Sequence, residues 1–168
     1  MSRPAALSDS DRASLTEVRG LFAAAGEPTA DMLVGRHRAR FVGPAWWRHL
    51  AVGLVAALGM PGWAGKEFWP TADPDVLDGR NLLLRRGALV PSFPMRARVA
   101  PSRLDGGPAL VVTYPVPAPW RWRQVTDELR PLASGSLVGL TVSSLPVMPG
   151  GLPFRLDRES AATPEPPG

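Results

Sequence analysis

The chain of 168 residues has no cysteine, a single lysine and only two histidines. Without cysteine it can form no disulfide, thiolate metal site or cysteine nucleophile. Zinc sites usually take three or four His, Cys or carboxylate ligands, and the chain offers only His37 and His49 as nitrogen ligands. We therefore predict no metal and no cofactor.

Long hydrophobic runs are also missing. The longest, Leu50 to Met60, has eleven residues, against about twenty for a membrane-crossing helix. The N-terminal residues MSRPAALSDSDRASL have no apolar core ahead of their charges, so they do not resemble a secretory signal. These patterns predict a cytoplasmic protein without a membrane span, in which residues 50–60 belong to a buried or interfacial helix.

The charge balance is weakly basic, with 19 Lys and Arg against 15 Asp and Glu. Because the carboxylates are interspersed, this excess does not by itself indicate nucleic-acid binding. The 45% hydrophobic and 20% charged residues are typical of a folded domain. We predict one β-barrel domain over residues 1–159, followed by a disordered tail over residues 160–168.

Three arginine-rich segments repeat with a period of two residues, which is the period of a β-strand. Neighbouring side chains of a strand point to opposite faces, so each segment has a guanidinium face and an apolar face. The segments are Arg36, Arg38 and Arg40, then Arg96 and Arg98, then Arg121 and Arg123 alternating with Trp120 and Trp122.

Strands and turns follow one another as in an antiparallel meander. Glycine-containing turns are expected at residues 105–107, 133–136 and 149–151. The strands are expected at Arg36–Phe41, Trp63–Trp69, Asn81–Arg86, Arg96–Arg103, Ala109–Val116, Trp120–Arg123, Gln124–Leu132, Leu137–Leu145 and Leu152–Arg158. Two helices precede most of them, one capped by Ser8 or Ser10 and ending near Ala25, the other from Pro44 or Ala45 to Leu58. This order predicts a mainly β protein, an antiparallel barrel that is closed or nearly closed; a half-open sheet packed on one helix is the alternative.

Four stretches resemble the bacterial GxWxG-domain proteins, a largely uncharacterised family. They are TADMLVGRHRA (29–39), LGMPGWAGKEF (58–68), DELRPL (127–132) and PFRLDRE (153–159). In the motif that gives the family its name, Gly35 is present, His37 stands in the place of tryptophan and Ala39 in that of the second glycine. The resemblance implies a lipocalin-like barrel with a small-molecule cavity, and it implies no particular reaction.

Lys66 is the first candidate for chemistry. If Lys66 and Phe68 face the barrel interior, the lysine lies in an apolar cavity, where it can act as a base, form a Schiff base or bind an anionic head group. If instead Trp63 and Glu67 face inward, Lys66 faces water and Glu67 pairs with an arginine. The sequence leaves both arrangements open.

Asp127 and Arg130 lie three residues apart and therefore face opposite sides of a regular strand, unless a bulge intervenes. Salt bridges to neighbouring strands are the simpler expectation for both. His37 shares a face with Ala39 and Phe41, where a hydrogen-bonded core histidine is expected rather than a haem ligand. His49 is expected to pack at the second helix.

Residues 120–123 (WRWR) could stack bases and bind phosphates. On a strand, however, Trp120 and Trp122 would point inward while Arg121 and Arg123 point outward, so one surface would not hold both functions. We expect nucleic acid not to be the partner.

We predict that the barrel binds an apolar or amphipathic small molecule in its cavity, with residues 50–60 closing one end. The expected wall residues are Trp63, Lys66, Phe68, Tyr114, Trp120 and Trp122. A cofactor-free cyclase or isomerase acting in the same cavity is one alternative. An arginine-rich module that binds protein or nucleic acid is the second. The sequence motifs of hydrolases, kinases and dehydrogenases are absent, and the oligomeric state stays open.

Overall fold

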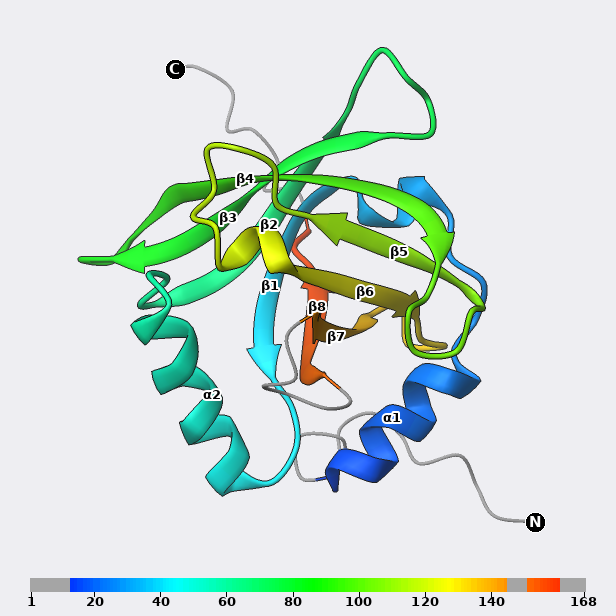
Figure 1. Cartoon of the computed structure of the whole chain (residues 1–168), viewed down its shortest axis with the longest axis horizontal. Helices are drawn as coiled ribbons and strands as arrows, with labels where there is room; N and C mark the ends of the chain where they lie inside the picture. The colour runs from blue at the N-terminus through cyan, green and yellow to red at the C-terminus, as the bar shows by residue number, and fades with distance from the viewer. Residues whose placement is uncertain (1–12, 145–150, 161–168) are drawn as a thin grey trace.

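The computed structural model describes residues 13–144 and 151–160, and within them the chain forms a closed antiparallel barrel (Figure 1). Each strand pairs with the next along the chain, and β1 pairs with β8 to close the barrel. The strands are β1 (Gly35–Phe41), β2 (Trp63–Pro70), β3 (Leu77–Arg85), β4 (Ala88–Pro101), β5 (Pro108–Thr113), β6 (Val125–Pro131), β7 (Leu137–Ser143) and β8 (Leu152–Arg158). The predicted barrel is confirmed, and closure leaves no sheet edge to protect.

Within the part of the chain that the structure describes, two α-helices accompany the barrel. Helix α1 (Leu15–Ala24) begins at Ser14, whose side chain forms a capping box with Glu17. Ser14 caps α1 instead of the predicted Ser8 or Ser10, which lie outside the described residues. Val18 and Phe22 of α1 pack on the outer face of the barrel, against Val138 and other apolar residues.

Helix α2 (Ala45–Ala57) follows Pro44, close to its predicted bounds. The described residues also contain two 3₁₀ turns, η2 (Ala30–Leu33) and η3 (Trp122–Gln124). Figure 1 shows α2 at one end of the barrel, close to the tip of the β3–β4 hairpin. Ala51 and Val55 are the buried residues of α2 and belong to the barrel core.

The strand predicted at Trp120–Arg123 is wrong. Residues 115, 117 and 119 are prolines, which cannot donate to a β-ladder. The chain therefore leaves the sheet after Thr113, turns through η3 and re-enters at Val125. Trp120 is consequently 56% exposed, whereas Trp122 is buried.

The arginines of β1 lie outside the barrel, as their period of two predicts. Arg36 pairs with Glu67 at 3.3 Å and Arg40 pairs with Asp157 at 2.8 Å. Arg38 lies 3.6 Å from Glu159. His37, between Arg36 and Arg38, is buried. The arginines of β1 thus form ion pairs on the outer surface of the barrel, and the residues that alternate with them face the lumen.

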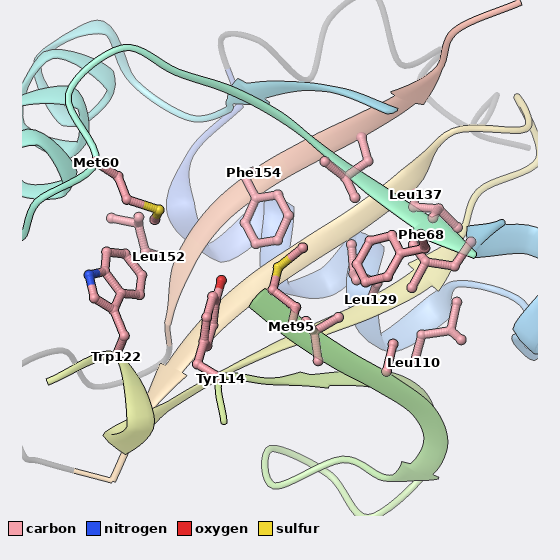
Figure 2. Close-up of a cluster of buried hydrophobic side chains, with 14 of the residues drawn as sticks. Met60, Phe68, Met95, Leu110, Tyr114, Trp122, Leu129, Leu137, Leu152 and Phe154 are labelled. Carbon is pink, nitrogen blue, oxygen red and sulfur yellow. The ribbon is translucent and has the colours of Figure 1, made fainter. Parts of the chain in front are cut away.

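The lumen is packed with side chains along most of its length. Figure 2 shows Phe68, Leu110, Leu129 and Leu137 together toward one end, and Met60, Trp122 and Leu152 toward the end where α2 lies. Phe154 lies between the two groups, and Gly139 on the neighbouring strand leaves room for its ring, because a Cβ there would overlap it. The barrel is therefore a filled core rather than an open cup.

Of the two arrangements that the sequence left open for β2, each is confirmed in part. Lys66 and Phe68 face inward, and Glu67 faces outward between Arg36 and Arg80. Trp63 also packs inside, because the register with β3 shifts between Trp63 and Gly65.

The turns at residues 105–107 and 133–136 connect strands as predicted. Residues 149 and 150 of the third predicted turn, Leu145 of the strand predicted at Leu137–Leu145, and residues 161–168 of the predicted tail lie outside the described residues.

Candidate functional site

A charged pair lies inside the barrel. Lys66 of β2 and Asp127 of β6 come from strands on opposite sides of the lumen, and Lys66 Nζ lies 2.7 Å from Asp127 Oδ2. Their side chains are 1% and 2% exposed. Burial of both charges removes their hydration, so the pair and its hydrogen bonds must compensate for that loss.

Three further polar groups surround the ammonium group of Lys66. It donates to Tyr114 Oη at 2.8 Å and to Asn81 Oδ1 at 3.1 Å, and Met95 Sδ lies 3.3 Å away. Trp63 Nε1–H donates to the same Asn81 oxygen at 3.0 Å. With Asp127 included, every hydrogen of the lysine ammonium group has an acceptor within the protein.

Asp127 is equally well satisfied. Tyr114 donates its hydroxyl proton to Asp127 Oδ2 at 2.5 Å, and Thr141 of β7 donates to Oδ1 at 2.6 Å. The carboxylate thus accepts hydrogen bonds on both oxygens. Lys66, Asn81, Tyr114, Asp127 and Thr141 form one connected group, which we call the lumen cluster.

Aromatic rings border the lumen cluster. Lys66 Nζ lies 5.2 Å from the ring centre of Tyr114, 5.4 Å from that of Trp63 and 6.0 Å from that of Phe154. Trp63 packs edge-on against Phe154 at 5.5 Å. These distances allow cation–π attraction to the lysine. The cluster therefore has a polar centre within an apolar, aromatic wall.

Burial shifts the pKa values of Lys66 and Tyr114. Loss of hydration lowers the pKa of Lys66, and the charge and hydrogen bond of Asp127 oppose that shift. Loss of hydration and the adjacent Asp127 both raise the pKa of Tyr114 well above that of a free phenol. Tyr114 consequently stays a neutral hydrogen-bond donor across the physiological range.

Two buried side-chain nitrogens near this level of the barrel have no hydrogen-bond partner among the described residues, Asn81 Nδ2 and His37 Nδ1. His37 and Asn81 both pair in register with Lys66, one on each side of β2. Desolvation and the charge of Arg158 lower the pKa of His37, so its imidazole is neutral. No three His, Asp or Glu side chains of residues 13–144 and 151–160 are placed to hold a metal ion.

A small cavity adjoins the lumen cluster on the side of α2. Its volume is about 10 Å³, room for roughly one water molecule. Lys66, Tyr114, Asp127 and Thr141 line it on the polar side. The apolar lining consists of Phe41, Val55, Met60, Trp63, Trp122 and Leu152.

Met60 and Trp122 cover the cavity, and both come from segments between strands. Trp122 Nε1–H donates to the carbonyl of Leu58 at 2.8 Å, which joins η3 to the end of α2. The Trp122 ring also packs 5.3 Å from Tyr114 and 6.1 Å from Phe93. Figure 2 shows Met60, Trp122 and Leu152 grouped beside Tyr114.

Of the six residues predicted as cavity walls, the structure places Trp63, Lys66, Tyr114 and Trp122 at the cavity. Phe68 lies in the lumen, at the end away from Trp122 (Figure 2). Trp120 lies on the outer surface because its segment is not a strand.

Sequence reasoning did not assign Asn81, Asp127 or Thr141 to the site. The period of two on β6 carries a signal for Asp127, because it places the aspartate on one face with Val125 and Leu129. Arg130 takes the other face, as predicted. Its guanidinium group pairs with Asp105 at 2.6 Å beside the ring of Phe22 in α1.

Comparisons with known proteins identify the fold alone. No family model matches the chain, and no curated protein matches it. A crystal structure of a protein from Thermomonospora curvata superposes with a TM-score of 0.64 at 21% sequence identity, covering 92% of this chain and 93% of that one. Within the described residues no helix is both long and apolar enough to cross a membrane.

Proposed function

We propose that the barrel binds an uncharged amphipathic small molecule, with its polar end at the lumen cluster and its apolar body beneath α2. The observation that carries the proposal is the buried Lys66–Asp127 pair lining the only polar side of the cavity described above. Apolar residues of similar volume often stabilise a core as well as a buried ion pair does, or better. A pair kept at a cavity is therefore better explained by recognition than by stability.

The charge of the lumen cluster favours an uncharged polar group. Lys66 and Asp127 neutralise each other, so an anionic head would approach a carboxylate as closely as an ammonium group. A ligand carbonyl can accept from Lys66 in place of Met95 Sδ, and a ligand hydroxyl can donate to Asp127. This differs from the anionic head expected when Lys66 is considered alone.

Binding requires side-chain movement, because a cavity of about 10 Å³ does not hold a ligand of several carbons. Met60 and Trp122 are the covering groups, and neither belongs to a strand. Their displacement breaks no hydrogen bond of the barrel ladder. The unbranched Met60 side chain has several rotamers with which to adapt to a ligand.

The experiment compares dodecanol, dodecanal and dodecanoate, which share one chain length and differ in the polar end. Native mass spectrometry measures occupancy, and quenching of tryptophan fluorescence measures affinity, since Trp63 and Trp122 line the cavity. We expect the alcohol and aldehyde to bind more tightly than the carboxylate. Met60→Ala enlarges the space beneath α2 and is expected to strengthen binding of both.

Phe68→Leu is the matched control, because it removes volume from the other end of the lumen and should leave affinity unchanged. Absence of binding by all three compounds, in both the folded native protein and Met60→Ala, would show that the lumen takes no such ligand. Equal binding by Met60→Ala and Phe68→Leu would place the ligand elsewhere.

The same site supports a second candidate, a cofactor-free cyclase or isomerase. The neutral hydroxyl of Tyr114 donates to Asp127 in this structure. If it turned to a substrate carbonyl it could donate there, and Asp127 would then be free to accept a proton. Conversion of a reactive, polyketide-like compound, detected as a new product by mass spectrometry and lost in Tyr114→Phe, would support this candidate. Binding without conversion supports the first.

Two further observations bear on the alternatives. The resemblance to GxWxG-domain proteins includes the segment that carries Lys66, and we propose membership of that family on this basis. The ion pairs of Arg36, Arg38 and Arg40 with neighbouring carboxylates argue against the outer face of β1 as a nucleic-acid surface.

A further inference from the structure

The end of the barrel at α2 has an exposed apolar surface. Eight of the eleven large hydrophobic side chains that are exposed in the described residues come from three segments, 45–62, 84–90 and 114–124. We call these segments together the α2 rim. The eight are Trp46, Leu50, Val52, Leu84, Leu89, Val90, Val116 and Trp120.

The three segments adjoin one another. The backbone N–H of Leu84, near the tip of the β3–β4 hairpin, donates to the carbonyl of Gly62 at 2.7 Å. Trp122 Nε1–H donates to Leu58 at 2.8 Å, so η3 and the hairpin meet the same turn after α2. Figure 1 shows the hairpin tip close to the upper end of α2.

The apolar groups of the rim stand well out of the protein. Trp46 is 63% exposed and Leu50, one helical turn further, is on the same side of α2. Val116 is 73% exposed in the loop that precedes η3. Large apolar side chains gathered at one end of a barrel mark an interaction surface.

The charge of the rim has one sign. Its three segments contain Arg48, Arg85, Arg86, Arg121 and Arg123 and no Asp or Glu, although the chain has 15 acidic residues. All of these arginines except the half-buried Arg48 are exposed. The guanidinium group of Arg121 lies 5.6 Å from the ring centre of Trp120. The same three adjoining segments therefore carry both the exposed apolar groups and the arginines.

We propose that the α2 rim docks on the surface of an anionic lipid bilayer. The interface of a bilayer accepts aromatic and aliphatic side chains, while anionic head groups attract arginine. A nucleic acid would use the arginines and stack on Trp120, yet it offers no apolar partner for Leu50, Val52 or Leu89. A bilayer satisfies both kinds of group at once.

Docking at this end would place the cover of the lumen at the membrane. Met60 and Trp122 lie within the rim segments and cover the cavity. A lipid-derived amphipath could then pass between bilayer and lumen without crossing water. The docking proposal itself depends on the surface alone, so it stands or falls separately from ligand binding in the lumen.

The experiment is cosedimentation of the full chain with vesicles of phosphatidylcholine, with and without phosphatidylglycerol. We expect binding to the anionic vesicles, weakening as salt is added. Each arginine near an anionic surface contributes about a fivefold increase in binding. Reversal of two charges in Arg85→Glu/Arg86→Asp should therefore weaken it by about 25-fold or more. Aspartate suits position 86, where φ is +49°.

Matched controls come from the other end and side of the barrel. Arg98→Glu/Arg103→Asp makes the same change in net charge and should leave binding within about twofold, apart from a small long-range effect. Trp46→Ser should reduce binding several-fold, whereas Trp69→Ser, which changes an exposed tryptophan of β2, should not. Circular dichroism of each variant verifies folding.

Three results would overturn the proposal. One is equal binding of wild type to neutral and anionic vesicles, or to neither. Another is sensitivity of both arginine pairs to the same degree, which indicates nonspecific charge attraction. The last is failure to bind vesicles together with evidence for another partner. That evidence would be salt-sensitive binding to a single-stranded oligonucleotide, or a dimer, seen by analytical ultracentrifugation, that Trp46→Ser abolishes. If the protein binds dodecanol but not vesicles, this docking proposal fails while the proposed ligand binding in the lumen stands.

Discussion

Two cation–carboxylate pairs that involve strand β6 lie on opposite sides of the barrel wall and differ in how far water reaches them. Asp127 points into the lumen and meets Lys66, with both side chains fully enclosed. Arg130 points outward beneath α1 and meets Asp105, which is 37% exposed. Water partly solvates the charges of the outer pair, whereas only protein groups stabilise the charges of the inner pair.

The outer pair has a clear structural role. Arg130 donates to the backbone carbonyls of Phe22 in α1 and Pro108 in β5, besides its two bonds to Asp105. It thereby holds helix, strand and turn together. The inner pair joins strands that the closed barrel already holds, and it lines a cavity. The comparison indicates that the outer pair stabilises the fold, and it supports our proposal that the inner pair serves ligand binding.

The largest effect is expected from Lys66→Met, which leaves the Asp127 carboxylate buried without a cation. Removing one partner of a buried pair costs about 3–5 kcal/mol in the free energy of unfolding. Urea denaturation measures this change. The double variant Lys66→Met/Asp127→Asn leaves no buried charge, keeps an acceptor oxygen for the Tyr114 or Thr141 hydroxyl, and should regain most of the loss. A double variant as unstable as the single one would assign the pair a stabilising role and remove the contrast.

Arg130→Met should cost less, about 2 kcal/mol, because two backbone carbonyls lose their donor while Asp105 turns to water. The same urea measurement applies. Here Arg130→Met/Asp105→Asn should recover little, since the lost bonds to Phe22 and Pro108 remain lost. If this double variant regained as large a share of the free energy of unfolding as the double variant of the inner pair, the two pairs would have the same structural role.

Tyr114→Phe tests the enclosed character of the inner site through pH. The pKa of Tyr114 is raised in the folded protein, so above pH 10.0, the value of a free tyrosine, the unfolded chain loses a proton that the folded one keeps. Unfolding free energy then falls with pH, by at most about 1.4 kcal/mol per pH unit. The variant should lack this fall. Parallel pH profiles of the two proteins would show that Tyr114 titrates normally.

Asp105→Asn should give the smallest effect. Hydrogen bonding to Arg130 lowers the pKa of Asp105, so its contribution is present above the ordinary value of 3.8 and is lost as pH falls through the folded value. Since this carboxylate is partly exposed, the contribution should stay below about 1 kcal/mol. Comparing urea unfolding of variant and wild type at neutral and acid pH measures it. A larger loss would place Asp105 with the enclosed groups.

Much of the barrel could be predicted from local patterns. The alternation of arginines with apolar residues at 36–41 defines β1, and glycine turns at 105–107 and 133–136 separate strands that follow. The same alternation failed at residues 120–123, because the three prolines before it remove the donors that a strand needs. A period of two thus has to be weighed together with its flanking residues.

The candidate site could be predicted only in part. Lys66 stood out as the single lysine, but its direction depends on the register of β2 against β3, which changes next to Trp63. Tyr114, just after β5, was predicted as a wall residue, whereas Asp127 was not assigned to the site. They become a site because barrel closure brings β2, β5 and β6 around one lumen.

The sequence by itself determined the chemistry that is available: no thiol, one lysine, and strands with a charged and an apolar face. Those properties follow from composition and from the two-residue period, which are local. Tertiary structure alone decided that Lys66 meets Asp127, that Met60 and Trp122 cover them, and that the exposed apolar and cationic groups share one end. Such pairings join residues far apart in the chain, and only the closure and register of the barrel place them within contact distance.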